Sequence, residues 1–222
     1  MYVPRHFEMT PTQVGDLLAS AETAQLVTAH PDGPVATLLP TLWRPGAGGE
    51  LGSLVFHVTR TNDQWRDHGV GEALAILSGP DAYVAPQWLA SFADSPDVPT
   101  WNYVTVHAYG ELVTRDADWT RRAVADLSAA HGYDTRLVDP DAMDRMLRAI
   151  VGIELLLTRV VAKAKLSQNK SPDDVAGIIG GLRDVEAAGL ASAMEEISLP
   201  HAVARYELVG EIRARRARGA LA

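Results

Sequence analysis

The chain has 222 residues, of which 47% are hydrophobic, and a net charge of −8. This length and apolar content suit one sizeable domain, or one domain with an extension. There is no cysteine, which excludes disulfides, thiolate nucleophiles, cysteine-ligated zinc and iron–sulfur clusters. The acidic balance disfavours DNA binding, and no apolar run approaches the roughly 20 residues of a membrane-spanning helix. The opening MYVPRHF lacks the pattern of a signal peptide, so a cytoplasmic protein is expected.

The first half of the chain predicts one helix followed by strands. Thr10-Pro11-Thr12-Gln13 has the form of a capping box with proline at the first helical position, which predicts a helix over residues 11–21. Strands are predicted where β-branched and aromatic residues lie between turn signals. These are Ala24–Ala29, Pro34–Leu42, Leu54–Thr59, Glu72–Leu77 and, most strongly, Val98–Val113. The segment SGPDAYV is predicted to make a turn into a further strand.

The second half alternates less regularly between helix and strand. Apolar residues at helical spacing predict helices over 117–130 and 141–150, and a strand is predicted over 153–163. A further helix begins after Ser171, and the alanine-rich remainder from about 186 is expected to be helical. Strands without regularly interleaved helices argue against a doubly wound sheet and favour a small β-barrel with outer helices. We expect a barrel domain over 1–185 and a helical extension over 186–222.

A first polar cluster is KAKLSQNKSPDD, residues 163–174. Lys163 and Lys165 alternate with alanines, so both point to the same side of a strand end. A helix N-terminus follows at Ser171 and adds a partial positive charge. Three neutral side chains that can donate hydrogen bonds to phosphate lie between them: Ser167, Gln168 and Asn169. The cluster therefore indicates either an anion site, most simply for a cofactor phosphate, or an ordinary polar turn.

A second cluster is FHVTRTNDQW, residues 56–65. It places His57 on a strand, with Arg60 and Asn62 at the strand end and Trp65 nearby. Arg60 can contact a phosphate or carboxylate with two parallel hydrogen bonds. The alternative is that Trp65 anchors the core and Arg60 belongs to a surface ion pair.

A third cluster is VPTWNYVTVHAYG, residues 98–110. Strand alternation puts Tyr103, Thr105, His107 and Tyr109 on one side, which is unusually polar for a barrel core. That side is expected to line a ligand cavity or a wet subunit interface, although a lone histidine such as His107 is more often a hydrogen-bonded core group. Trp101 is a candidate stacking surface, or simply part of the core.

Common enzyme motifs are absent from the sequence. It contains no H-E-x-x-H zinc helix, no G-x-S-x-G nucleophile elbow and no phosphate-binding glycine loop. These patterns leave open whether the protein is an enzyme.

Six segments, taken together and in order, resemble the PaiB family of FMN-binding negative transcriptional regulators. The VPTWNY and KLSQN segments are the most specific, and the resemblance spans roughly residues 1–185. The segments are MYVPRHF, VATLLP (35–40), FHVTRTNDQW (56–65), ALAILSGPDAYVAPQW (73–88), VPTWNYVTVHAYGEL (98–112) and AKLSQNKS (164–171).

The resemblance implies an α+β, mainly β fold: a split β-barrel with peripheral helices, usually a homodimer with flavin at the subunit interface. It implies three walls of an FMN site, formed by residues 163–169, by the cluster from His57 to Trp65, and by Trp101 with Asn102. Family members often have glycine where this chain has Phe56, and an aromatic residue where it has Ala164, and both changes would reshape the cavity.

Three functions follow as expectations. The first is a cofactor-binding regulator of transcription; direct contact with DNA would then need the arginine-rich tract Arg213–Arg218 or a partner protein. The second is an enzyme on the same barrel, using flavin or, as in piperazate synthases, haem. Haem would need an axial ligand, for which His57 is preferred and His107 is second. The third is an interaction module with a vestigial pocket.

Overall fold

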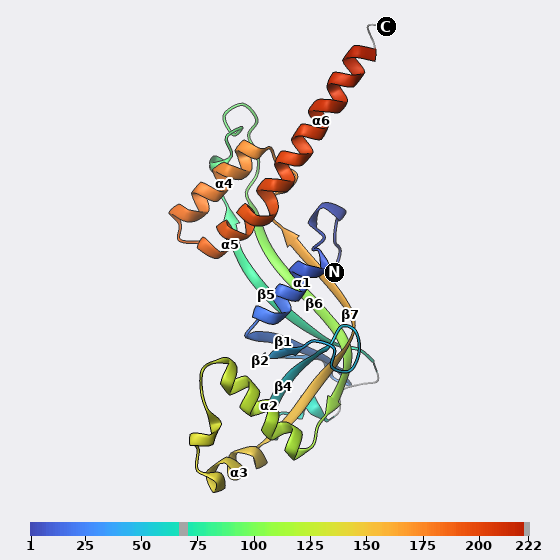
Figure 1. The fold of residues 1–222 in the computed structure, drawn as a ribbon, viewed down its shortest axis with the longest axis vertical. Helices are drawn as coiled ribbons and strands as arrows, with labels where there is room; N and C mark the ends of the chain where they lie inside the picture. The colour runs from blue at the N-terminus through green and yellow to red at the C-terminus, as the bar shows by residue number, and fades with distance from the viewer. Residues whose placement is uncertain (67–70, 220–222) are drawn as a thin grey trace. The chain divides into compact units, whose positions relative to one another are not determined.

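The computed structural model describes residues 1–66 and 71–219 (Figure 1). The chain groups into two compact units, each built from several segments. Unit 1 contains Met1, Thr10–Ser78 and Thr105–Ala162. Unit 2 contains Tyr2–Met9, Gly79–Val104 and Lys163–Ala222, of which 220–222 lie outside the described residues. The predicted boundary at residue 185 is a different division and stays a prediction.

In the described part of the chain, seven strands form one sheet in the order β2-β1-β5-β6-β7-β4-β3. The pairings of β1 with β2 and β5, and of β4 with β3 and β7, are antiparallel. The strands are β1 (Thr23–His30), β2 (Gly33–Pro40), β3 (Leu42–Arg44), β4 (Ser53–Thr59), β5 (Ala73–Val84), β6 (Thr100–Thr114) and β7 (Ile150–Lys165).

Six α-helices accompany the sheet within residues 1–66 and 71–219. They are α1 (Pro11–Ser20), α2 (Ala117–Ala130), α3 (Pro140–Arg148), α4 (Pro172–Asp184), α5 (Ala188–Ala193) and α6 (Leu199–Gly219). The predicted capping box is present, because the Thr10 and Gln13 side chains each accept a hydrogen bond from the other residue's backbone N–H. Ser171 is the N-cap of α4, and its side chain accepts a hydrogen bond from the backbone N–H of Asp174. None of these helices, within the residues described, is long and apolar enough to cross a membrane.

The core of unit 1 lies on one face of its strands. Leu54, Phe56 and Val58 of β4 alternate inward and are almost fully buried, as are Val106 and Ala108 of β6. Each of the larger side chains among them contributes about 1.5–3 kcal/mol through burial, and the methyl of Ala108 about 0.8 kcal/mol. The period of two along each strand, which the sequence shows, therefore decides which face carries the core.

The opposite face of β4 is covered by α2. Val55 packs there against Ala123 and Leu127. The close approach requires Gly152 of β7, where an added Cβ would lie 2.3 Å from Oγ1 of Thr120. The short α2–α3 segment is thus fixed against the strand ends that carry the second polar cluster.

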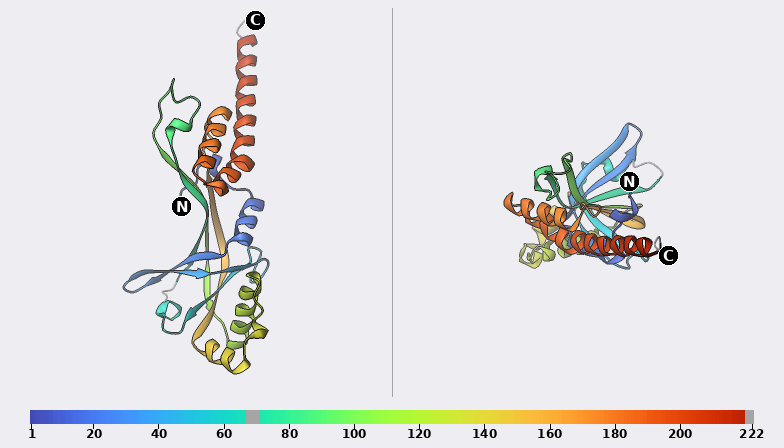
Figure 2. Two further views of the ribbon diagram at one scale, coloured as in Figure 1. Left: turned by 90° about the vertical axis from the view of Figure 1, so that its left-hand side faces the viewer. Right: turned by 90° about the horizontal axis from the view of Figure 1, so that it is seen from above.

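In unit 2, α4, α5 and the start of α6 pack together (Figures 1 and 2). Gly177 and Gly181 of α4 let the helix lie against Trp88, which follows β5. This packing holds the end of the KAKLSQNKS tract, since α4 begins directly after it.

One predicted turn is absent. The segment SGPDAYV continues β5 without a break through Val84. The pairing of β5 with β1 ends at Ile76, so on that side Pro80 interrupts no ladder hydrogen bond. A proline is tolerated in a strand under that condition.

Candidate functional site

The predicted site residues fall into two groups, one in each unit. His57, Arg60, Asn62 and Trp65 belong to unit 1. The second group lies in unit 2 and consists of Trp101, Asn102, Lys163, Lys165, Ser167, Gln168 and Asn169.

Arg60 ties the end of β4 to the start of β7. Its Nε donates to the carbonyl of Arg148 and its Nη2 to that of Ile150, each at 2.9 Å. The backbone carbonyl of Arg60 in turn accepts from Nε1 of Trp65 at 3.4 Å. Both acceptors of the guanidinium are neutral, so its charge is held in place without being compensated by them.

Asn62 belongs to a buried network that the sequence did not reveal. Its Oδ1 accepts from the backbone N–H of Gln64 at 2.9 Å. Gln64 is 1% exposed; its Oε1 accepts from Thr37 at 2.6 Å and its Nε2 donates to the carbonyl of Leu26 at 2.9 Å. These bonds join β1, β2 and the segment after β4, and they fix the shape of the predicted site loop.

Two histidines of unit 1 have unmet hydrogen-bonding capacity. In both His57 on β4 and His107 on β6, Nδ1 is shielded from solvent and has no partner among the described residues. Burial lowers the pKa of His57, and burial, followed by the charge of the N-terminus, lowers the pKa of His107. Both imidazoles are therefore held in the neutral form at neutral pH.

The predicted polar side of β6 is half-buried in unit 1. Thr105, His107 and Tyr109 alternate there with fully buried apolar residues. The guanidinium of Arg159 lies 3.6 Å from the ring centroid of Tyr109 and bonds to Glu72 at 3.0 Å. The side is thus polar and partly open, as the alternation predicts.

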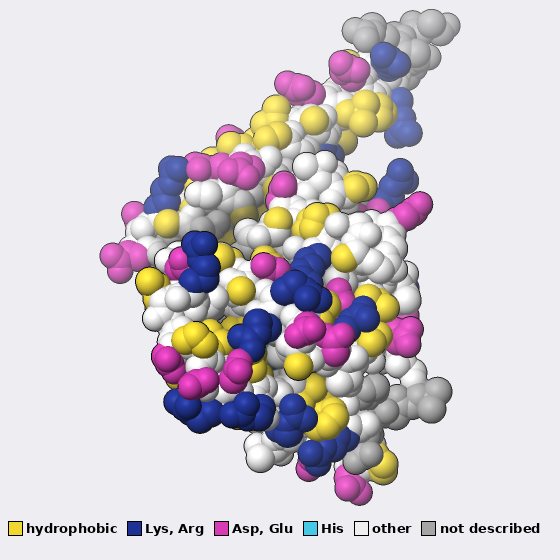
Figure 3. All heavy atoms as spheres, turned by 60° about the horizontal axis from the view of Figure 1, so that its bottom comes forward, with side chains coloured by type: hydrophobic (Ala, Val, Ile, Leu, Met, Phe, Trp, Pro, Cys, Tyr) yellow, Lys and Arg dark blue, Asp and Glu magenta, His cyan; other side chains and the backbone are white. Residues whose placement is uncertain are grey.

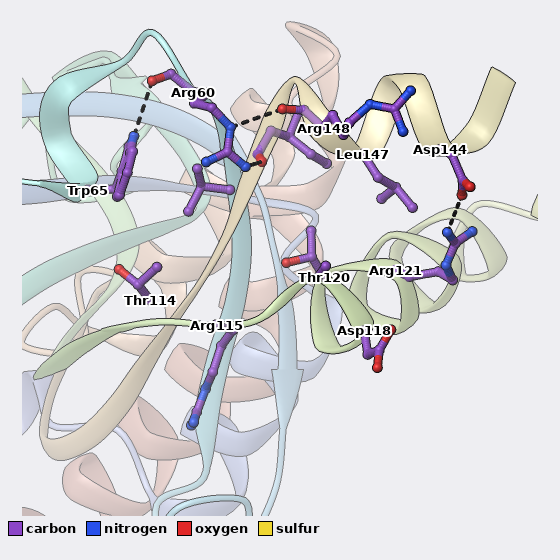
Figure 4. A pocket seen from close by; sticks show the side chains of 13 residues that line it. Arg60, Trp65, Thr114, Arg115, Asp118, Thr120, Arg121, Asp144, Leu147 and Arg148 are labelled. Atoms are coloured by element: carbon purple, nitrogen blue, oxygen red, sulfur yellow. Dashed lines mark hydrogen bonds and ion pairs between the residues drawn. The ribbon is translucent and has the colours of Figure 1, made fainter. Parts of the chain in front are cut away.

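A cavity of about 320 Å³ in unit 1 brings Arg60 and Trp65 together (Figure 4). Three further arginines, none singled out by the sequence motifs, also line it: Arg115, Arg121 and Arg148. Two aspartates share the lining, Asp118 and Asp144. No local pattern signals this set, because the arginines come from the end of β6, from α2 and from α3.

Two of these arginines are paired with carboxylates. Arg121 forms an ion pair with Asp144, and this bond, more than the nearby charges, lowers the pKa of Asp144. Arg115 Nε bonds at 2.7 Å to Glu154, whose buried carboxylate also accepts from Ser53 at 2.5 Å. The buried Glu154 on β7 therefore holds the Arg115 guanidinium in position.

In unit 2, Lys165 is held by its own neighbours. Its Nζ donates to Thr100 Oγ1 and to the carbonyl of Trp101, each at 2.5 Å. Burial, followed by the charge of Lys163, lowers the pKa of Lys165. Lys163 lies 5.3 Å from the ring centroid of Tyr103, close enough for a cation–π contact.

The structure joins two of the predicted walls. Asn102 Nδ2 donates to Ser167 Oγ at 3.0 Å, and both residues are buried. Ser167 adopts a φ of 62°, which is uncommon for a non-glycine residue. Gln168 folds back, so that its amide accepts from Leu166 N at 2.9 Å and donates to Ala164 O at 2.6 Å. These three side chains thus make hydrogen bonds inside unit 2.

Trp101 differs from its neighbours because half of its surface is exposed. Its Nε1 donates to Asp81 at 2.7 Å, and its ring meets that of Tyr83 edge-on. Asn169 contributes its backbone carbonyl to Arg205 at 2.9 Å. Trp101 is therefore a half-exposed aromatic ring of unit 2, on a residue whose backbone carbonyl accepts from Lys165.

No group of three or more metal-ligating side chains occurs within the residues that the structure describes.

The antiparallel sheet and its helices define the molecule as a split-barrel protein of the α+β class, with polar side chains at its strand ends. Residues 1–159 match the family model described as "Putative FMN-binding domain". The chain belongs to that family.

Relatives and solved structures agree with this assignment. The chain is 28% identical over 207 residues to the Bacillus subtilis "Protease synthase and sporulation protein PAI 2", covering 88% of this chain and 97% of that protein. It has the fold of the flavocytochrome Anf3 from Azotobacter vinelandii, with a TM-score of 0.55, 15% identity and coverage of 73% and 72% of the two chains. It also has the fold of the Mycobacterium tuberculosis protein Rv2991, with a TM-score of 0.52, 14% identity and coverage of 74% of this chain and 91% of that chain. The predicted family, fold class and cofactor class are confirmed.

Proposed function

We propose that this chain binds FMN. The observation that carries the proposal is the pair of neutral histidines, His57 and His107, whose buried Nδ1 atoms find no partner among the described residues. Buried polar atoms are almost always hydrogen-bonded in folded proteins. The isoalloxazine ring of a flavin offers both donors and acceptors, so it could satisfy such groups, and the family match supports the same cofactor.

The predicted contacts remain part of the proposal, with a role for each group. In unit 1, Arg60 retains N–H groups beyond the two used for carbonyls, and Asn62 and Trp65 shape the adjacent loop. In unit 2, Trp101 offers a stacking plane and Lys165 a fixed cation. Lys163 is a second cation beside it. The buried side chains of Asn102, Ser167 and Gln168 hold these groups in position in this proposal and make fewer direct contacts than the sequence suggests. Asn169 is exposed and stays a proposed contact.

We further propose a homodimer. Leu38 on β2 is 64% exposed, and β2 is an end strand of the sheet order. An exposed apolar side chain on an edge strand is a place where a second copy can pack. In this proposal the second copy completes the flavin site and shields the polar side of β6.

Titration of flavin-free protein with FMN and with riboflavin tests the proposal. We expect saturable quenching of flavin fluorescence, weakened about tenfold by His107→Ala, because one buried hydrogen bond is worth about 1–3 kcal/mol. The exposed histidine His131 provides the matched control, and His131→Ala should bind FMN normally. Protein that binds neither flavin under any condition would refute the proposal.

Lys165→Ala tests the group in unit 2 by itself. If Lys165 contacts the phosphate, the variant binds FMN more weakly, whereas its affinity for riboflavin, which lacks the phosphate, is unchanged. Equal losses for both flavins would show that Lys165 does not contact the phosphate.

Haem is the second candidate, favoured by the same histidines. A neutral imidazole is the form that binds a metal, and His57 and His107 are kept neutral by burial. The absorption spectrum separates the candidates, since haem gives a Soret band and flavin does not. Loss of that band in His57→Ala, but not in His131→Ala, would assign the axial ligand.

A role in transcription, in the cytoplasm, is the remaining part of the proposal, prompted by the PaiB resemblance. The net charge of −8 opposes direct contact with DNA. The exposed residues Arg213, Arg215 and Arg216 near the end of α6 are the candidate basic surface; the side chain of Arg218 lies outside the described residues. A gel shift at low salt tests direct contact, and the absence of a shift there would transfer the role to a partner protein.

A further inference from the structure

The arginine-lined cavity of unit 1 has an excess of positive charge. Its lining carries four arginines and two aspartates (Figure 4). Figure 3 shows Lys and Arg side chains gathered on the face that carries α2 and α3, with acidic side chains between them. The volume of about 320 Å³ lies at the lower end of the range for small-molecule sites, roughly 300–1,000 Å³.

Two of the four arginines have no carboxylate partner. Arg115 is paired with Glu154 and Arg121 with Asp144. Among the residues that the structure describes, no carboxylate lies within ion-pair distance of Arg60 or Arg148. Once these two pairs are set aside, the lining keeps the charges of Arg60, Arg148 and Asp118, which leaves an excess of about one positive charge.

Arg60 is also fixed in position before any ligand arrives. Two of its N–H groups are used by backbone carbonyls, and a guanidinium has five. The remaining N–H groups belong to a side chain that has already lost its rotamer freedom, which lowers the entropic cost of binding. The first turn of α2 forms another wall through Ala117 and Asp118.

We infer that this cavity binds a phosphate group, carried by a small phosphate monoester or by the flavin itself. Arg60 supplies the fixed donors, Arg148 supplies the second charge from the α3 rim, and Arg121 lines the opposite wall. A guanidinium suits this ligand because its planar donors match the spacing of phosphate oxygens. The inference does not depend on the flavin proposal, since a phosphate ligand other than FMN satisfies the same residues.

Titration calorimetry with inorganic phosphate at constant ionic strength tests the inference. We compare the parent chain with Arg148→Ala, because Arg148 forms no ion pair among the described residues and removing its side chain breaks no described hydrogen bond. Arg145→Ala is the matched control: it lies on the same helix, α3, carries the same charge and does not line the cavity. We expect Arg148→Ala to lower the affinity for inorganic phosphate about tenfold, and Arg145→Ala to lower it less than twofold.

Two results would overturn the inference. One is the absence of saturable phosphate binding to the parent chain, and the other is equal weakening by the two variants, which would indicate a diffuse charge effect. FMN and riboflavin then identify the source of the phosphate. If Arg148→Ala weakens FMN and leaves riboflavin unchanged, the group belongs to the flavin; if it weakens inorganic phosphate and leaves both flavins unchanged, the ligand is a separate phosphate compound.

Discussion

Two adjacent glycines of α4 should respond in opposite directions to the same substitution. Gly180 is exposed, and a Cβ added there would meet nothing within 4 Å. Gly181 is buried, and its Cβ would lie 2.2 Å from Cδ2 of Trp88, with two further ring atoms within 2.5 Å. The helix, the residue type and the substitution are the same, so the comparison isolates the packing against Trp88.

The expected magnitudes follow from these surroundings. Alanine replaces glycine inside a helix with a gain of about 0.5–1 kcal/mol, so Gly180→Ala should stabilise the protein by that amount. At Gly181 the same gain is opposed by overpacking, which costs about 1–3 kcal/mol. Because the obstacle is a rigid indole ring, we take the upper end, which gives a net loss of about 2 kcal/mol. The two variants should therefore differ by about 3 kcal/mol.

Urea denaturation of the two variants, monitored by tryptophan fluorescence and far-ultraviolet circular dichroism, measures this difference. The midpoint should rise for Gly180→Ala and fall for Gly181→Ala, with unchanged slopes. A Gly181→Ala variant as stable as Gly180→Ala would show that Trp88 does not pack on α4 as described. The reasoning about unit 2 would then be wrong.

Three further predictions concern the candidate sites. Arg115→Ala should destabilise the protein by about 2–4 kcal/mol, because it leaves the buried Glu154 carboxylate unpaired; the figure is reduced from that of a fully buried pair since one third of the arginine side chain is exposed. Glu154→Gln should cost clearly less, since the arginine can be solvated, and equal losses in urea denaturation would contradict this account. Burial depresses the folded-state pKa of His57 below its unfolded value of about 6.5. As the pH is lowered through that value the unfolded state binds more protons, so the stability of the protein decreases. His57→Gln should flatten that part of a stability–pH curve, and an unaltered curve would exclude His57 as the cause. Asn102→Ala should cost about 1–3 kcal/mol in thermal unfolding, because Ser167 loses its buried partner, and a variant as stable as the parent would show that this bond adds no net stability.

Local patterns in the sequence predicted most of the helices and strands, and the ordered motifs predicted the family. The capping box at Thr10 and the N-cap at Ser171 placed two helix starts correctly, since both are local hydrogen-bonded motifs. Alternation in residues 98–113 assigned the buried and open sides of β6, because side chains on a strand have a strict period of two. The continuous β5 was missed, since Gly79-Pro80 reads locally as a turn while its tolerance depends on where the neighbouring strand ends.

The hydrogen-bond partners of the polar site residues became known from the folded chain and not from its motifs. Arg60 was predicted as an anion ligand, but in the structure two of its N–H groups donate to the backbone carbonyls of Arg148 and Ile150, about ninety positions away in the chain. Asn102 and Ser167 were placed on separate walls, and the fold bonds them to each other. The cavity of Arg60, Arg121 and Arg148 has no local signature, because its members come from separate elements. Local patterns record which backbone conformation a segment prefers, whereas the partners of a charged or polar side chain depend on long-range packing that no short segment encodes.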